Sequence, residues 1–112
     1  MKLKFILMLT IVSTLFSVNI LASDAYTKTS FKVSGNCDMC KERIEKAAKI
    51  EGVKNAIWNQ ETHILTVAFV PTKTTLDQIQ QNIANTGYDT PMFKSTEENY
   101  KKLPQCCQYS KE

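Results

Sequence analysis

The feature that most restricts the fold of this chain is the order of two hydrophobic periodicities between residues 27 and 94. Apolar residues at every second position are typical of half-buried strands, whereas spacings of three and four are typical of amphipathic helices. The pattern predicts strands at 27–33, 53–60, 64–70 and 88–94, and helices that begin at Asp38 and after Thr75 and end at Gly52 and Gly87. This order is the ferredoxin-like βαββαβ arrangement, so we predict an α+β sandwich with two helices on a four-stranded antiparallel sheet.

The last predicted strand has a restricted position. Residues 88–94 contain Pro91, which has no backbone N–H to donate to a neighbouring strand. Because prolines within sheets are confined to edge strands and bulges, we expect residues 88–94 to form an edge of the sheet.

The first 22 residues have the pattern of a secretory signal peptide. Lys2 and Lys4 precede an apolar run, and small residues follow at Ala22 and Ala25. We predict that residues 1–22 are a signal peptide, cleaved after Ala22 or after Ala25, and that the protein is a bacterial periplasmic or secreted protein. A retained membrane anchor is the alternative, but the run is slightly shorter and more polar than the ~20 apolar residues of a spanning helix.

Charge and composition give no reason to expect a nucleic-acid partner. The formal net charge is +3, and two of the positive charges belong to Lys2 and Lys4 of the predicted signal peptide. There is no basic stripe beside aromatic residues, which is the usual feature of a nucleic-acid-binding surface. The sequence also has one histidine and no glycine-rich phosphate loop, so we expect a monomeric binding protein and not an enzyme.

Four cysteines occur as two close pairs, Cys37 with Cys40 and Cys106 with Cys107. A disulfide between adjacent residues is rare, because it cannot meet the usual Cα separation. Close thiol pairs are better suited to binding a metal or exchanging disulfides. Cys37 and Cys40 stand where a predicted strand leads into a predicted helix. Unpaired N–H groups and the helix dipole there favour thiolate, the form that binds metals.

These motifs, in this order, resemble the heavy-metal-associated domain family. The resemblance covers residues 27–94 and includes Val33, Gly35, Cys37, Cys40, Ile44, Gly52, Val53, Val67, Gly87 and Tyr88. The family contains copper chaperones, metal-binding modules of P-type ATPases and the periplasmic mercury-binding protein. The resemblance therefore implies a ferredoxin-like fold, a soft metal ion bound by Cys37 and Cys40, and a membrane metal transporter or efflux component as a partner.

These residues leave the identity of the bound metal undecided. The family usually has Gly-Met-x-Cys before its second cysteine, whereas Gly35 here is one residue closer to Cys37 and the methionine, Met39, lies inside the motif. Thiolates select Cu(I), Zn(II) or Hg(II). We favour Cu(I), which accepts two or three sulfurs, because Zn(II) requires four ligands in a closed site.

Three further residues are candidates for the surroundings of the site. The predicted strand directions place the turn at 61–63 and the loop at 87–88 at the same end as the cysteine loop, so we expect His63 and Tyr88 near the thiols. The resemblance implies that Tyr88 tunes the site without binding the metal. Met39 has a soft thioether that binds metals weakly. The more ordinary roles are a solvated turn residue for His63 and loop packing for Met39 and Tyr88.

Residues 95–112 form a polar C-terminal tail beyond the predicted domain. The pattern predicts a short helix at 96–102, followed by a turn that contains Cys106 and Cys107. Twelve residue steps separate Lys94 from Cys106, and these span at most ~40 Å when extended. The tail can therefore fold back, so that the four sulfurs bind Zn(II) or a small Cu(I) cluster or form cross-disulfides. The alternative is a disordered tail with independent thiols.

The sequence thus predicts an exported soft-metal-binding protein, a metallochaperone or scavenger, that binds Cu(I) through the Cys37-x-x-Cys40 loop. One alternative is a periplasmic thiol–disulfide redox protein that uses Cys37 and Cys40 together with Cys106 and Cys107. A third interpretation is a structural disulfide between Cys37 and Cys40.

Overall fold

The computed structural model describes residues 25–111. The predicted signal peptide, residues 1–22, lies outside the described residues, and its cleavage stays a prediction. Within the described part of the chain, no helix is both long and apolar enough to cross a membrane.

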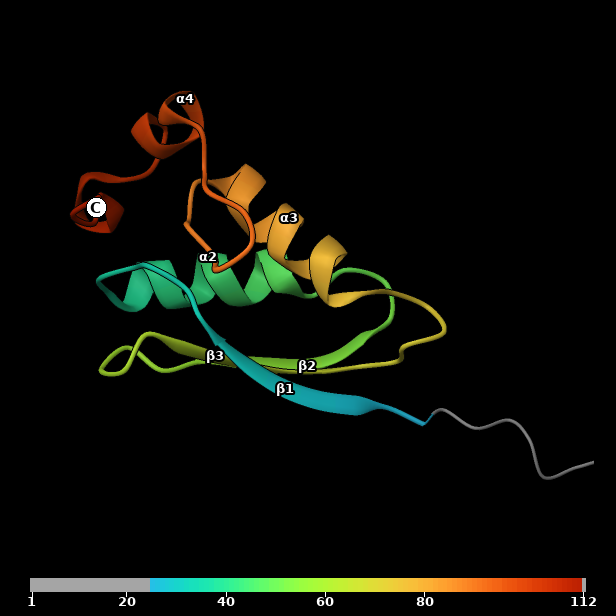
Figure 1. The fold of residues 1–112 in the computed structure, drawn as a ribbon. Coiled ribbons are helices and arrows are strands. Elements are labelled where there is room, and N and C mark those ends of the chain that lie inside the picture. Colours follow the sequence, from blue (N-terminus) through green and yellow to red (C-terminus); the bar gives the residue numbers. More distant parts are fainter. Residues whose placement is uncertain (1–24, 112) are drawn as a thin grey trace, which may run out of the picture.

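The fold consists of a sheet covered on one face by helices (Figure 1). The elements in chain order are β1 (Thr27–Lys32), α2 (Asp38–Ala48), β2 (Val53–Trp58), β3 (Ile64–Phe69), α3 (Leu76–Thr86), α4 (Glu97–Lys101) and the 3-10 turn η2 (Gln105–Cys107). Strand β3 lies in the middle of the sheet and pairs antiparallel with both β1 and β2. Helices α2 and α3 form the second layer, and α4 lies outside them. The α+β, ferredoxin-like layering agrees with the prediction.

The prediction of a strand at 88–94 is wrong. In the described part of the chain, these residues do not pair with any strand of the sheet. The backbone closes a tight turn around Pro91 instead, in which Thr90 N–H and Thr90 Oγ1 both donate to the Phe93 carbonyl at 2.8 Å. One bond, from Ser34 N–H to the Asp89 carbonyl at 3.1 Å, still links this segment to the end of β1. Local turn bonds and a proline therefore replace the fourth strand.

Helix α3 begins and ends where the sequence predicts, whereas α2 begins at Asp38 as predicted but ends at Ala48, four residues before Gly52. Thr75 Oγ1 accepts a hydrogen bond from Gln78 N–H at 3.2 Å and caps the start of α3. Gly87 ends α3 with a φ of 119°, a left-handed conformation that favours glycine. Helix α2 turns a buried face toward the sheet, formed by Cys40, Ile44, Ala47 and Ala48.

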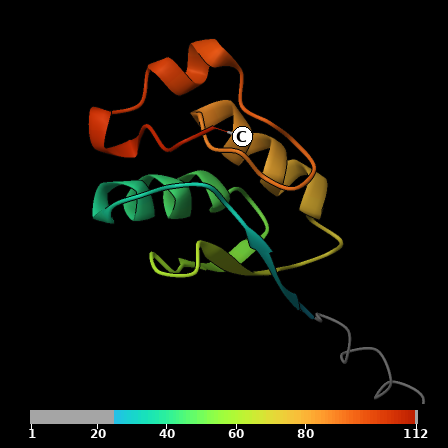
Figure 2. The ribbon, with the colours of Figure 1, turned by 60° about the vertical axis from the view of Figure 1, so that its left-hand side comes forward.

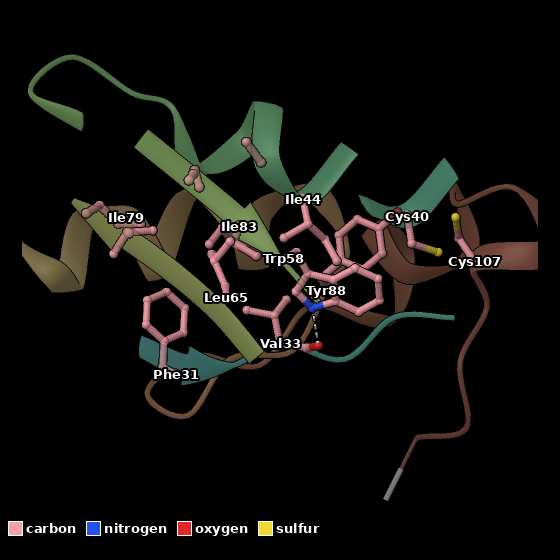
Figure 3. Packing of buried hydrophobic residues seen from close by; sticks show 14 of the residues in the cluster. Phe31, Val33, Cys40, Ile44, Trp58, Leu65, Ile79, Ile83, Tyr88 and Cys107 are labelled. Atoms are coloured by element: carbon pink, nitrogen blue, oxygen red, sulfur yellow. Dashed lines mark hydrogen bonds between the residues drawn. The ribbon is translucent and has the colours of Figure 1, made fainter. Parts of the chain in front are cut away.

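The core lies between the sheet and the two helices, and Trp58 is at its centre (Figure 3). Its indole Nε1–H donates to the Val33 carbonyl at 3.0 Å, which fixes the chain just after β1. A Cβ at Gly35 would lie 3.0 Å from the Trp58 ring and 3.1 Å from Ile44. Glycine at position 35 thus lets the loop that carries Cys37 pass directly over the core.

The C-terminal tail packs onto the domain and extends its core. The predicted short helix is present as α4, and Leu103, Cys107 and Tyr109 are buried members of the main hydrophobic cluster. Figure 2 shows the η2 segment above the first turn of α2, and the two elements are in contact. The tail therefore reaches the end of the molecule that carries Cys37 and Cys40.

Candidate metal centre

Cys37 and Cys40 stand at the start of α2. Cys37 is the N-cap residue, with extended backbone, and its carbonyl accepts the first helical bond from Lys41 N–H at 3.1 Å. No side chain caps this helix end, so its N–H groups can stabilise a negative charge nearby. Cys40 follows in the first turn and is fully buried, and the two sulfurs are 3.4 Å apart. Two soft ligands thus lie side by side at the positive end of a helix.

The tail places both of its cysteines beside this pair. The Cys37 sulfur lies 2.7 Å from that of Cys106 and 3.7 Å from that of Cys107. Cys37, Cys40 and Cys107 form a group whose sulfurs all lie within 4.8 Å of one another. Figure 3 shows Cys40 and Cys107 facing each other at the edge of the core. All four cysteines are free thiols in the described chain. Of the arrangements considered for the tail, the structure adopts the folded-back one.

The two tail cysteines differ in their surroundings. Cys107 is fully buried, whereas Cys106 is exposed. The amide of Asn36, the residue before the first metal-loop cysteine, donates to the Cys106 carbonyl at 3.4 Å. This contact joins the tail directly to the loop that carries Cys37.

The thiols of the cluster differ in acidity. A hydrogen bond from Cys106, with smaller contributions from Cys40 and Cys107, outweighs desolvation and lowers the pKa of Cys37 to about 7. Burial, followed by hydrogen bonds to Cys40 and Cys37, raises the pKa of Cys107. The hydrogen bond to Cys37 also raises the pKa of Cys106. Without metal, the cluster therefore favours a single negative charge on Cys37, held by neighbouring S–H donors.

Tyr88 lies where the sequence places it, next to the thiols. Its ring is fully buried, and its hydroxyl has no hydrogen-bond partner among the described residues. Burial, with the neighbouring Cys107 as the second cause, raises the pKa of Tyr88. A buried hydroxyl without an acceptor is a donor available to a thiolate.

Met39 and His63 are less closely connected with the site. Met39 is half exposed, and His63 is not a member of the three-thiol group. The imidazole of His63 stacks on Trp58 with ring centroids 5.5 Å apart, and the residue has a φ of 62° in the turn between β2 and β3. The structure therefore gives His63 a packing role over the core edge.

Tyr109 is the residue that the sequence analysis missed. Its hydroxyl donates to the Gly87 carbonyl at 2.9 Å and accepts from Asp89 N–H at 3.1 Å. Tyr100 donates in turn to the Tyr109 carbonyl. These bonds hold the tail against the loop after α3. The signal in the sequence was the set of apolar residues, Leu103, Cys107 and Tyr109, within an otherwise polar segment.

A pair of thiols between a strand and a helix of a small α+β fold is the layout of a soft-metal-binding domain. The heavy-metal-associated domain model matches residues 30–89, which is more than half of the chain. The chain therefore belongs to the heavy-metal-associated domain family.

Known proteins that resemble the chain agree with this assignment. It is 37% identical over 73 residues to a copper-exporting P-type ATPase of Staphylococcus haemolyticus, and it spans 9% of the length of that relative. The CopZ metallochaperone superposes with a TM-score of 0.55 at 30% identity, over 57% of this chain and 98% of CopZ. The N-terminal domain of a potential copper-translocating P-type ATPase from Bacillus subtilis, in the Cu(I)-loaded state, gives 0.56 at 32% identity, over 59% and 85%.

Proposed function

We propose that this protein is an exported metallochaperone or scavenger that binds Cu(I) through Cys37 and Cys40. The observation that carries the proposal is the pair of thiols 3.4 Å apart at the uncapped start of α2, in a member of the heavy-metal-associated family. The role is binding and handover of an ion, not catalysis of a reaction.

Cu(I) is the favoured ion for two reasons. Thiolates are soft ligands, and Cu(I) is satisfied by two or three of them, whereas structural Zn(II) takes four. The solved relative from Bacillus subtilis is described in its Cu(I)-loaded state, and the curated relative is described as copper-exporting. Zn(II) and Hg(II) are the competing ions, since both bind thiolates.

The proposed location and partner follow from different observations. The pattern of residues 1–22 supports export to the periplasm or beyond, which removes the protein from the reduced cytoplasm. The match to a copper-exporting ATPase supports a membrane metal transporter or efflux component as the partner that gives or receives the ion. We propose that the protein meets this partner as a monomer.

Thiol–disulfide exchange by the same cysteines is the alternative. The short contact between Cys37 and Cys106 is compatible with it. The resemblances favour metal binding, since the named relatives are described as a metallochaperone and as copper-transporting ATPases.

Titration of the reduced protein with Cu(I) and with Zn(II), each against a competing chelator, tests the proposal. Native mass spectrometry then counts the ions bound. We expect tight Cu(I) binding that Zn(II) does not displace, and loss of binding in Cys37→Ser/Cys40→Ser. Binding of neither metal in the presence of the chelator, or rapid reduction of insulin disulfides without metal binding, would refute the proposed function.

A further inference from the structure

We propose that the C-terminal tail completes the metal site, with Cys107 as a third thiolate ligand beside Cys37 and Cys40. The site then binds one Cu(I) ion in three-coordinate sulfur and retains it. This inference rests on the proposed function, namely Cu(I) binding at Cys37 and Cys40, and adds to it a ligand from outside the matched domain, residues 30–89.

The distances between the sulfurs fit a shared ion. Three sulfurs bound to one metal in a plane, with metal–sulfur bonds of ~2.3 Å, lie ~4.0 Å from each other. The Cys37 sulfur is 3.4 Å from that of Cys40 and 3.7 Å from that of Cys107, and all three lie within 4.8 Å. Shifts of a few tenths of an ångström therefore convert the thiol cluster into a three-ligand site.

The tail is held in this place by contacts that do not involve a metal. Leu103 and Tyr109 are buried in the core cluster, and the Tyr109 hydroxyl bonds to Gly87 and Asp89. Gly87 itself leaves no space: a Cβ there would lie 2.8 Å from the Asn99 carbonyl. Because folding already orders the tail, Cys107 joins the metal at a small further cost in conformational entropy.

The surroundings of Cys107 suit a buried thiolate. Cu(I) with three thiolates carries a net negative charge, and the Cys40 and Cys107 thiols release their protons to solvent when the ion binds. The Tyr88 hydroxyl is a neighbour of Cys107 and has no hydrogen-bond partner among the described residues, so it can donate to the new thiolate. The uncapped start of α2 supplies further donors.

Cys106 is the matched comparison for Cys107. It is the next residue in the chain and has the same side chain, but it is exposed and stands outside the three-thiol group. Its contact is with Cys37, at 2.7 Å, which is shorter than two sulfurs on one metal require. Cys106 therefore covers Cys37 in the metal-free state and leaves it when the ion binds.

The burial of the ligands separates this site from an open pair of thiols. Cys40 and Cys107 are both fully buried, and Cys37 is half-buried. An acceptor protein that takes the ion by ligand exchange can reach Cys37 first, but must displace the tail to reach the other two sulfurs. We therefore expect slower transfer of Cu(I) from the wild type than from a variant without Cys107.

X-ray absorption at the copper edge, on the purified and reduced protein loaded with one equivalent of Cu(I), counts the sulfur ligands without any substitution. We expect three sulfurs for the wild type, three for Cys106→Ser and two for Cys107→Ser. Competition with a chromophoric Cu(I) chelator should give roughly tenfold or greater loss of affinity for Cys107→Ser and an affinity close to wild type for Cys106→Ser. Cu(I) transfer to the chelator should be faster from Cys107→Ser.

Two sulfurs in the wild type, or a Cys107→Ser variant with unchanged affinity, would overturn the inference while leaving Cu(I) binding by Cys37 and Cys40 intact. Loss of affinity in Cys106→Ser with none in Cys107→Ser would overturn it as well. No Cu(I) binding by the wild type would remove the proposed function itself. Because the sulfur count is made on the wild type, it decides the question even if Cys107→Ser folds poorly.

Discussion

Tyr109→Phe tests whether the tail is a firmly held part of the domain. The phenol is 4% exposed, and its hydroxyl donates to the Gly87 carbonyl at 2.9 Å, accepts from Asp89 N–H at 3.1 Å and lies 3.2 Å from Ser95 Oγ. Phenylalanine keeps the ring and its packing. The substitution therefore removes the hydrogen bonds alone.

The magnitude follows from those bonds. Each contributes about 0.5–1.5 kcal/mol net, and a buried N–H left without an acceptor costs about 1–3 kcal/mol. We expect the free energy of unfolding of Tyr109→Phe to fall by about 2–3 kcal/mol, which lowers Tm by about 10–20 °C in a domain of this size. Urea unfolding monitored by circular dichroism measures the free energy directly.

Tyr26→Phe is the control for this substitution. Tyr26 is 59% exposed, so loss of its hydroxyl should change the free energy of unfolding by less than about 0.5 kcal/mol. If Tyr109→Phe is as stable as Tyr26→Phe, the hydroxyl does not anchor the tail and the structural argument for a preformed Cys107 ligand loses its basis.

The pH dependence of the stability difference between wild type and Tyr109→Phe gives a second check. Burial raises the pKa of Tyr109 to about 12, above the value of ~10 in an unfolded chain. The folded state thus favours the protonated phenol, so its contribution is complete below pH 10 and is lost as the pH rises from 10 to 12. The difference in stability between wild type and Tyr109→Phe should narrow across this window.

Three further predictions concern the loop, the thiols and the metal. Gly35→Ala should lower the free energy of unfolding by about 1–3 kcal/mol, because the new Cβ lies 3.0 Å from Trp58; urea unfolding measures this. Because the pKa of Cys37 is lowered to about 7, chiefly by Cys106, iodoacetamide at pH 7 should alkylate Cys37 first. Cys106→Ala, which removes the S–H donor, should slow this step, as read by mass spectrometry. Finally, free Cu(I) at a hundredfold excess over its Kd should stabilise the fold by about 2.7 kcal/mol, and a chelator should reverse this in a thermal melt.

Much of the fold could be predicted from the sequence because the determining interactions are local. The two helices have clear hydrophobic faces, and Thr75 and Gly87 mark the ends of α3 by capping chemistry that depends only on neighbouring residues. The missing fourth strand has a local cause as well. Pro91 marked residues 88–94 as an edge strand, but the Thr90 side chain satisfies the same backbone groups in a turn and leaves the ladder unformed.

The Cys37–Cys40 pair could be found from its spacing together with its position between a predicted strand and a predicted helix, which holds the two side chains within one turn. The residues around the pair are harder to predict from the sequence. Strand direction places Tyr88 beside the thiols, where the structure has it, whereas it does not reveal that the His63 ring stacks on Trp58. The direction in which a turn side chain points depends on its backbone conformation. His63 has a φ of 62°, which cannot be predicted from the sequence.

The position of Cys106 and Cys107 could not be decided from the sequence for a physical reason. Chain length only limits the reach of the tail, to at most ~40 Å for twelve extended residues, and so allows both a folded-back and a free tail. What decides between them is a set of partners that tertiary packing creates: the carbonyl of Gly87, the N–H of Asp89 and a core surface for Leu103. Gly87 and Asp89 stand 22 and 20 residues before Tyr109 in the chain, so a reading of neighbouring residues does not reveal these bonds. The third sulfur is thus a product of the folded domain, which is why stability of the tail and affinity for Cu(I) should fall together in Tyr109→Phe.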